Sequence, residues 1–256
     1  RKLLRPIIHS WVPMSPDLEQ WQVNSVGVAP AKIYQLYNGV DATLCTPDEQ
    51  ARQNWPIEAW RDPDLVIIGA VGRMEAVKDP LNLVRAFIGL CAKLPAQQAS
   101  HLRLADLGDG PLREQAQAMV QDAGLAQSCW FAGARNDIAQ LMPAMDIFVL
   151  PSLGEGISNT VLEAMSCALP VIGTAVGGTP ELVTEDTGQL VPSADPQTLS
   201  AAMATYVDDR ALRRAHGANA RHRIETTFAL PVMIERYHSI YMQLLGNDLN
   251  TTQARG

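Results

Sequence analysis

The sequence predicts an α/β fold, built on an open, mainly parallel six-stranded sheet with helices on both faces. From residue 65 onward, short apolar runs alternate with helical patterns at intervals of roughly 20 to 40 residues, as in successive strand–helix–strand units. Several helical patterns also begin with a capping residue followed by proline, a common way to start a helix. Together these two observations favour a parallel sheet.

Six short runs of apolar, β-favouring residues account for the predicted strands. Runs of this length and composition, bounded by turn residues, indicate buried strands. The runs are Leu65–Val71, Leu102–Leu107, Cys129–Ala132, Ile147–Leu150, Val171–Gly173 and Gln189–Val191.

Start signals place helices between these strands. An aspartate or serine side chain can accept hydrogen bonds from the first free amides of a helix, and proline fits the first helical position. The signals are Asp79 before Pro80, Asp109-Gly110 before Pro111, and Ser158 before Asn159–Cys167.

The chain divides into three parts. Residues 1–62 are interrupted by prolines, which predicts the tail of a preceding domain and an interdomain connection. Residues 63–245 carry the strands and end in three helical patterns between Pro196 and Leu245. Residues 246–256 are expected to form a flexible tail. Because the first residue is not methionine, we expect the chain to be part of a longer protein.

Composition excludes several classes of protein. The chain has 27 acidic and 20 basic side chains and a net charge of −7, which argues against nucleic acid as a partner. Its apolar runs are too short to cross a bilayer. The cysteines, Cys45, Cys91, Cys129 and Cys167, form no Cys-x-x-Cys pair. We therefore expect neither a zinc site nor a disulfide framework, but reduced core thiols.

Two carboxylates flank a predicted helix start. Glu155 follows a strand, and Glu163 falls on the second turn of the next helix. The backbone amides of Ser158, Asn159 and Thr160 lie between them, where a helix N-terminus accommodates phosphate. Carboxylates suit ribose and sugar hydroxyls. Spacing alone also allows Glu163 to be an exposed helix residue and Glu155 a simple loop charge.

Two cations follow the first predicted strand. Arg73 comes directly after Gly72, and Lys78 precedes the Asp79-Pro80 helix start. Open α/β sheets bind ligands outside the carboxyl ends of their strands, so both cations are expected to face the Ser158–Thr160 amides. They could stabilise a departing diphosphate without a metal. Solvated surface charge remains the alternative reading.

Glycine-rich loops end other strands. Gly177-Gly178-Thr179-Pro180-Glu181 allows close approach of backbone to a ligand, or a tight turn. Gly108-Asp109-Gly110-Pro111 and Gly133 could shape a base or ribose pocket, and plain turn chemistry explains them equally well.

These motifs, in this order and spacing, resemble the group 1 (family 4) glycosyltransferases of GT-B fold, specifically their C-terminal, Rossmann-like, donor-binding domain. The resemblance runs from about residue 7 to about residue 245. Its pieces are Gly72-Arg73 with Lys78, Gly108-Asp109-Gly110, Pro151-Ser152, Glu155-Gly156 through Glu163-Ala164-Met165, Pro170-Val171-Ile172, Gly177 to Glu181, and the segments Val12 to Leu18 and Tyr37 to Asp41.

The resemblance implies a retaining hexosyltransferase that needs no metal or cofactor and uses a UDP-, GDP- or ADP-sugar as donor. By similarity, Arg73 and Lys78 hold the diphosphate and Glu155 the donor sugar, and these three are the implied catalytic residues. We favour leaving-group stabilisation over a covalent intermediate on Glu155. The implied donor-binding positions are Gly72, Gly156, Ser158, Asn159, Thr160 and Glu163.

The sequence departs from the family pattern at two positions and in its extent. Ala168 stands where the family commonly has glycine, and Ile157 where an aromatic residue is frequent. The family's N-terminal domain, which would receive a glycan or lipid-linked acceptor, has no counterpart. We therefore expect the fragment alone to be inactive. By resemblance the last helix crosses back to that domain, and its apolar stripe between Pro231 and Leu245 could let the fragment form a homodimer.

Three other functions would also suit an α/β chain. A dinucleotide-binding dehydrogenase requires Gly-x-Gly-x-x-Gly after the first strand, and the chain lacks it. A nucleotide-sugar epimerase of GT-B fold and a non-catalytic nucleotide-sugar-binding module remain alternatives. Similar proteins build polysaccharides or lipid-linked glycans, so the resemblance implies a cytoplasmic enzyme that can attach peripherally to the inner face of the membrane.

Overall fold

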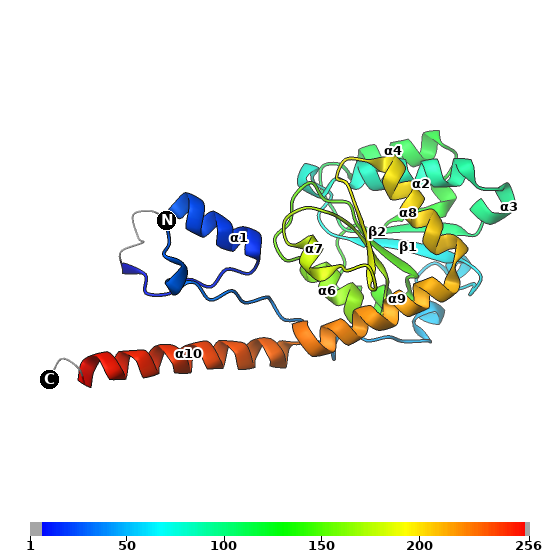
Figure 1. The fold of residues 1–256 in the computed structure, drawn as a ribbon. Helices are drawn as coiled ribbons and strands as arrows, with labels where there is room; N and C mark the ends of the chain where they lie inside the picture. Colours follow the sequence, from blue (N-terminus) through cyan, green and yellow to red (C-terminus); the bar gives the residue numbers. More distant parts are fainter. Residues whose placement is uncertain (1–6, 254–256) are drawn as a thin grey trace.

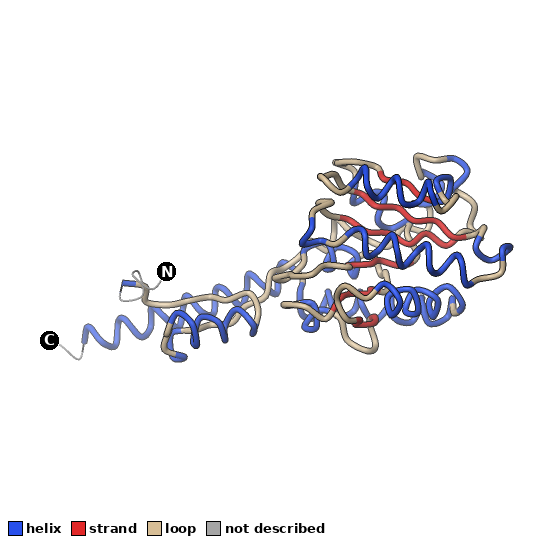
Figure 2. The backbone as a smooth tube through the Cα atoms, turned by 90° about the horizontal axis from the view of Figure 1, so that it is seen from above, coloured by secondary structure: helices blue, strands red, loops and turns tan. Residues whose placement is uncertain are grey.

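The computed structural model describes residues 7–253 of the chain, with side chains through residue 246. An α/β domain forms most of the molecule, and an arm of N-terminal residues projects from it beside the long C-terminal helix α10, Leu230–Gln253 (Figure 1). Figure 2 shows the sheet lying between helices.

The sheet is parallel and six-stranded, with strand order β3-β2-β1-β4-β5-β6. Each strand agrees with its predicted position to within one residue at either end, so the predicted fold class is confirmed. The apolar runs predict these positions well because the four central strands, β1, β2, β4 and β5, are almost entirely buried. The strands are β1 Val66–Val71, β2 Leu102–Leu107, β3 Cys129–Phe131, β4 Ile147–Leu150, β5 Val171–Thr174 and β6 Gly188–Val191.

Helices cover both faces of the sheet. On one face, α2, α4 and α8 pack their apolar residues against Ile68, Leu104 and Val149 of the central strands. On the other face, α6 and the segment after α9 pack against Phe148 and Leu150. The helices of the domain are α2 Pro80–Lys93, α3 Ala96–Ala99, α4 Arg113–Asp122, α5 Ile138–Leu141, α6 Asn159–Ser166, α7 Thr179–Leu182, α8 Pro196–Asp208 and α9 Arg210–Arg223.

Two of the three predicted helix starts are confirmed. Asp79 caps α2 by accepting from the Asn82 amide, and α6 begins directly after Ser158. The start at Pro111 was placed too early, because α4 begins at Arg113. The preceding residues are held elsewhere: the Leu112 amide donates to the Met74 carbonyl at 3.1 Å, and Gly110 has a φ of +155°.

Residues 41–62 pack on the domain. Trp55 and Trp60 are buried and stack on each other, with Trp130 of β3 against their edges. Their side chains belong to the same apolar core as Phe148 and Leu150. The predicted division at residues 62–63 therefore falls within a continuous core. The short turns of this segment are 3₁₀ helices, Ala51–Asn54 and Glu58–Trp60.

The arm and α10 leave the domain through one crossing. The Val40 amide donates to the Phe228 carbonyl, and the Leu230 amide donates to the Val40 carbonyl. Beyond it, Tyr34–Leu36 lies beside the first turns of α10, while Ile234, Tyr241, Met242 and Leu245 are exposed. The arm contains α1 Pro16–Trp21, a π-helical turn Gln22–Val26 and a 3₁₀ turn Pro30–Lys32.

The C-terminal helix is longer than predicted. The three predicted helical patterns appear as α8, α9 and α10, and α10 continues to Gln253, into the stretch 246–256 where a tail was expected. The last three residues of that stretch lie outside the described part of the chain. Among residues 7–253, no helix has the length and apolar character needed to cross a bilayer. The remaining short turns are Ala76–Lys78, Ala126–Ser128, Met142–Ala144 and Ile224–Phe228.

Candidate active site

The centre of the sheet is the point where its strand order reverses. Strands β1 and β4 are neighbours there, yet the chain continues from β1 to β2 on one side and from β4 to β5 on the other. The loops that follow such a pair diverge and leave a crevice at the carboxyl edge, which is where open α/β sheets bind ligands. Arg73 and Lys78 follow β1, and Glu155 follows β4.

A backbone hydrogen bond and a side-chain contact join these two loops. The Leu153 amide donates to the Val77 carbonyl at 2.8 Å, and a Cβ at Gly154 would lie 3.8 Å from the Val77 side chain. Because these contacts flank Lys78 and Glu155, both side chains leave the backbone at fixed neighbouring positions.

Lys78 and Glu155 form an ion pair. The Lys78 Nζ atom lies 2.5 Å from Oε1 of Glu155, and the Ser152 hydroxyl donates to the same oxygen at 2.6 Å. The Ser152 carbonyl in turn accepts from the Thr174 hydroxyl at 2.6 Å. The Glu155 side chain is only 8% exposed and that of Lys78 is 27% exposed. The carboxylate is therefore held in place, with its charge compensated.

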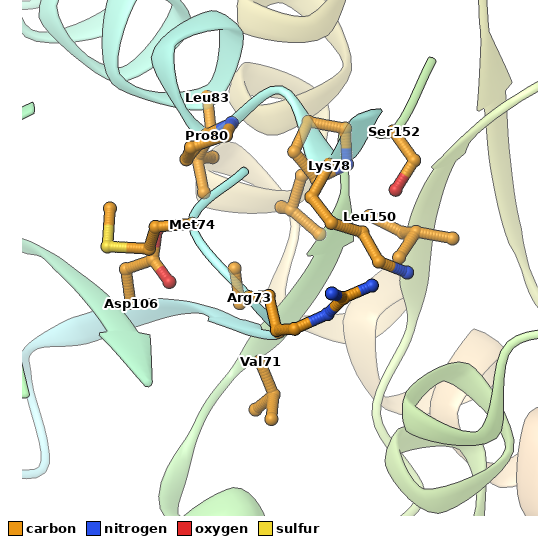
Figure 3. Close-up of a pocket in the computed structure, with 13 residues that line it drawn as sticks. Val71, Arg73, Met74, Lys78, Pro80, Leu83, Asp106, Leu150 and Ser152 are labelled. Atoms are coloured by element: carbon orange, nitrogen blue, oxygen red, sulfur yellow. The ribbon is translucent and has the colours of Figure 1, made fainter. Parts of the chain in front are cut away.

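Arg73 is far less restrained. Its side chain is 70% exposed, and within the described part of the chain it forms one ion pair, with Glu75 at 2.9 Å. An exposed pair of this kind contributes little to stability, so the guanidinium can exchange Glu75 for a better anion at small cost. Figure 3 shows Arg73 and Lys78 extending to the same side of the cavity between β1 and β4.

The first turn of α6 follows Glu155 in the chain. Ser158 is buried and precedes the helix without capping it through its side chain; its hydroxyl lies 3.1 Å from that of Thr160. Asn159 is exposed and accepts from the Asn38 amide nitrogen at 3.5 Å. The leading amides of a helix have no partner within the helix, so this turn presents donors to an anion.

Glu163 lies on the second turn of α6, as predicted, and is neither fully exposed nor fully buried. Desolvation raises the pKa of its carboxyl above the ordinary value. Its carbonyl accepts from the Cys167 amide at 3.0 Å, and its carboxylate makes no hydrogen bond or ion pair among residues 7–246. The structure places it one turn from the Ser158–Thr160 amides but in no contact with the Lys78–Glu155 pair.

The glycine loops contact protein backbone. A Cβ at Gly177, whose φ is +52°, would lie 1.8 Å from the Glu155 carbonyl oxygen, and one at Gly108 would lie 1.7 Å from that of Gly72. Gly178 donates its amide to the Gly156 carbonyl at 3.2 Å. These glycines approach the backbone of the two site loops, and the predicted approach to a ligand stays a prediction.

One residue of this region was missed by sequence reasoning. Asp106 lies in β2, is 3% exposed, and lines the cavity with Arg73, Met74 and Lys78 (Figure 3). Burial raises the pKa of its carboxyl to about 7. The signal was a carboxylate inside an otherwise apolar strand. The cavity volume open to water-sized molecules is about 20 Å³, room for about one water.

Comparison with known proteins decides the family. A family model described as glycosyl transferases group 1 matches residues 66–209. The chain belongs to the group 1 glycosyltransferase family. It is 32% identical over 225 residues to the lipopolysaccharide core biosynthesis mannosyltransferase LpcC of Rhizobium leguminosarum bv. viciae, a match that covers 83% of this chain and 60% of that protein. The chain spans 46% to 60% of the first three curated relatives that it matches.

Solved structures share the fold. The C-terminal domain of a group 1 glycosyltransferase, LpcC of Francisella tularensis, superposes with a TM-score of 0.65 at 25% identity, over 75% of this chain and all of that domain. HepE of Anabaena, solved in complex with UDP, superposes with a TM-score of 0.80 at 23% identity, over 95% of this chain and 65% of that one. The likeness confirms the predicted C-terminal domain of a GT-B glycosyltransferase.

Proposed function

We propose that this group 1 glycosyltransferase chain binds a nucleoside diphosphate sugar and contributes the donor half of a retaining transfer to an acceptor hydroxyl. The observation that carries the proposal is the cluster at the strand reversal, where exposed Arg73 lines the same cavity as Lys78 and Lys78 pairs with buried Glu155. Two cations and the leading amides of α6 supply the positive potential that a diphosphate requires.

The two cations act on the leaving group. When the bond between the anomeric carbon and the diphosphate oxygen breaks, its electron pair stays on the diphosphate. Arg73 and Lys78 neutralise that added charge, a form of stabilisation that needs no metal. The single Glu75 contact lets Arg73 turn toward the phosphates, while Lys78 already sits beside Glu155.

Glu155 positions the donor sugar in this proposal. One carboxylate oxygen accepts from both Lys78 and Ser152, so the other oxygen is available to sugar hydroxyls. A carboxylate held by two donors is a poor nucleophile, which favours a binding role over a covalent intermediate. Glu163 would hold the ribose from the next turn of the helix, with Gly72 and Gly156 giving the donor access to the loop backbones.

The relatives provide the basis for proposing a donor nucleotide and an acceptor for this chain. The Anabaena relative binds UDP, and the Rhizobium relative is a lipopolysaccharide core mannosyltransferase. We therefore propose a UDP-sugar as donor, with a GDP- or ADP-sugar as the alternatives, and a glycan or lipid-linked acceptor, bound by protein outside this chain at the inner face of the membrane.

The test replaces each cation in the full-length enzyme. Arg73→Ala and Lys78→Ala should each lower turnover by roughly 10² to 10³-fold, the range for loss of one group that stabilises transition-state charge. Arg85→Ala is the matched control, since Arg85 is an exposed cation on α2. Near-normal turnover in both site variants, with nucleoside diphosphate released and a new glycosidic bond formed, would refute the assignment.

A further inference from the structure

Three arginines at the start of α9 line one cavity at the amino edge of the sheet. Arg210, Arg213 and Arg214 all contribute to its lining, and its volume is about 320 Å³. Asp146 and Pro170 line it as well, and they directly precede β4 and β5. The cavity therefore lies at the edge of the sheet opposite the donor crevice, which follows the carboxyl ends of the strands.

The spacing of these arginines places them on one face of α9. Residues at i, i+3 and i+4 are neighbours on a helix surface, and like charges at this spacing repel each other. Arg210 is the first residue of the helix, so the three cations also lie near the end where the helix dipole favours anions. The arrangement destabilises the isolated helix, and an anion bound between the arginines relieves both effects.

No carboxylate of the described chain forms an ion pair with these three cations. Arg213 donates to the Tyr206 and Val207 carbonyls at the end of α8. Arg210 and Arg214 are exposed, and neither side chain makes a hydrogen bond to another described residue. Two guanidinium groups are thus available to a ligand.

Three acidic residues also line the cavity, and they leave an excess of positive charge. Asp146 is paired with Arg52, whose guanidinium lies 2.6 Å from its carboxylate. Asp48 accepts from the Gln50 amide at 2.8 Å, and both Asp48 and Glu49 are exposed. Because Arg52 compensates Asp146, three arginines face two acids. Those two acids can accept hydrogen bonds from hydroxyl groups.

We propose that this cavity is a binding site for a small phosphate ester that carries hydroxyl groups. The planar guanidinium group matches the oxygens of a phosphate bidentately, so Arg210 and Arg214 hold the phosphate while Asp48 and Glu49 accept from the hydroxyls. A lipid surface fits less well, because the two exposed acids would face its anionic head groups. The site uses no residue of the donor crevice, so this inference does not depend on the proposed donor.

Titration of the full-length protein with glycerol 3-phosphate tests the site, and we expect saturable binding by calorimetry. Arg210→Gln and Arg214→Gln should each weaken it by about tenfold or more, since each removes a charge-assisted hydrogen bond to the phosphate. Arg85→Gln is the matched control, because Arg85 is an exposed cation on α2 that does not line the cavity. Absence of saturable binding, or equal binding by wild type and the double variant Arg210→Gln/Arg214→Gln, would overturn the proposal.

A second double variant separates this site from the donor crevice, which binds phosphate groups in the proposed function. Arg73→Ala/Lys78→Ala should retain the binding of glycerol 3-phosphate. Loss of that binding in Arg73→Ala/Lys78→Ala, together with its retention in Arg210→Gln/Arg214→Gln, would assign the ligand to the donor crevice instead.

Thermal unfolding distinguishes a ligand site from a structural role of the arginines. Without ligand, Arg210→Gln/Arg214→Gln should have a midpoint equal to or above that of wild type, because repulsion at the helix start is removed. Saturating glycerol 3-phosphate should raise the midpoint of wild type but not of this variant. A lower midpoint in the ligand-free variant, with no effect of ligand on wild type, would indicate a structural role. Binding to phosphatidylglycerol vesicles without any binding of glycerol 3-phosphate would assign the arginines to a lipid surface.

Discussion

Glu155 and Asp106 are two buried carboxylates at the carboxyl edge of the same sheet, and their hydrogen-bonding environments differ. Glu155 accepts from Lys78 and Ser152. Asp106 lines a cavity among Met74 and Val149, with no hydrogen-bond donor to its side chain in the described chain. The difference teaches that burial alone does not define a functional carboxylate. Two donors hold the Glu155 carboxylate in place, while desolvation favours the neutral form of Asp106.

Asp106 should give the largest effect on stability. Its folded pKa, about 7, lies above the unfolded value of 3.8. The folded state therefore binds more protons between these values, and stability falls as pH rises through that window. About 3 pKa units correspond to about 4 kcal/mol. Asp106→Asn should remove this slope. Denaturant unfolding of both proteins at pH 4 and pH 8 measures it, and identical pH profiles would contradict the interpretation.

Glu155 should give the largest effect on activity. Glu155→Gln keeps the size of the side chain but removes its charge. The change therefore weakens both the contact with Lys78 and the binding of the donor sugar. Turnover should fall by roughly 10²-fold or more, as for loss of an oriented charged group. Asp106→Asn, measured in parallel at pH 7, should stay within several-fold of wild type. Equal losses of turnover in the two variants would contradict the proposed functional difference between the two carboxylates.

Lys78→Met tests how much the Lys78–Glu155 ion pair contributes to the free energy of unfolding. Loss of one member of a buried ion pair leaves an uncompensated charge, and because Lys78 is partly exposed we expect a cost of about 2 kcal/mol. The double variant Lys78→Met/Glu155→Gln should recover part of it. A double-mutant cycle by chemical denaturation checks the coupling, and strictly additive losses would show that the pair is not coupled.

Ser152→Ala gives the smallest expected change. It deletes one hydrogen bond to the Glu155 carboxylate but leaves Lys78 in place, and it should cost about 1 to 2 kcal/mol. The thermal midpoint measures the loss. Thr174→Val is a matched comparison, since it removes the hydroxyl that donates to the Ser152 carbonyl at 2.6 Å and to the Leu150 carbonyl at 3.4 Å, and leaves both bonds to Glu155 in place. A larger effect from Thr174 than from Ser152 would place the main restraint on the loop backbone.

Sequence reasoning located the strands well for a physical reason. Buried parallel strands such as β2 and β4 have apolar runs that end where burial ends, so their bounds can be read locally. The loops after β1 and β4 were also predictable, since the carboxyl edge of the sheet collects them. Placement of Arg73, Lys78 and Glu155 near one crevice followed from that topology.

Other features depend on contacts between distant segments. The Lys78–Glu155 ion pair depends on the hydrogen bond from the Leu153 amide to the Val77 carbonyl. No local sequence pattern encodes that hydrogen bond. The burial of Trp55 within the domain core, and the approach of Gly177 to the Glu155 carbonyl, are likewise tertiary. Asp106 was visible as an acidic residue in a strand, but its lack of partners could be known only from the fold.

The crossing of Val40 with Phe228 and Leu230 has a mechanical consequence. Both chain segments that leave the α/β domain pass through this one narrow neck. A Cβ at Gly39 would lie 2.9 Å from the Leu230 Cα atom and from the Met233 Cβ atom, so the neck has no room for a side chain there. The arm and α10 are thus joined to the domain at this crossing, and a side chain at position 39 would force its two segments apart.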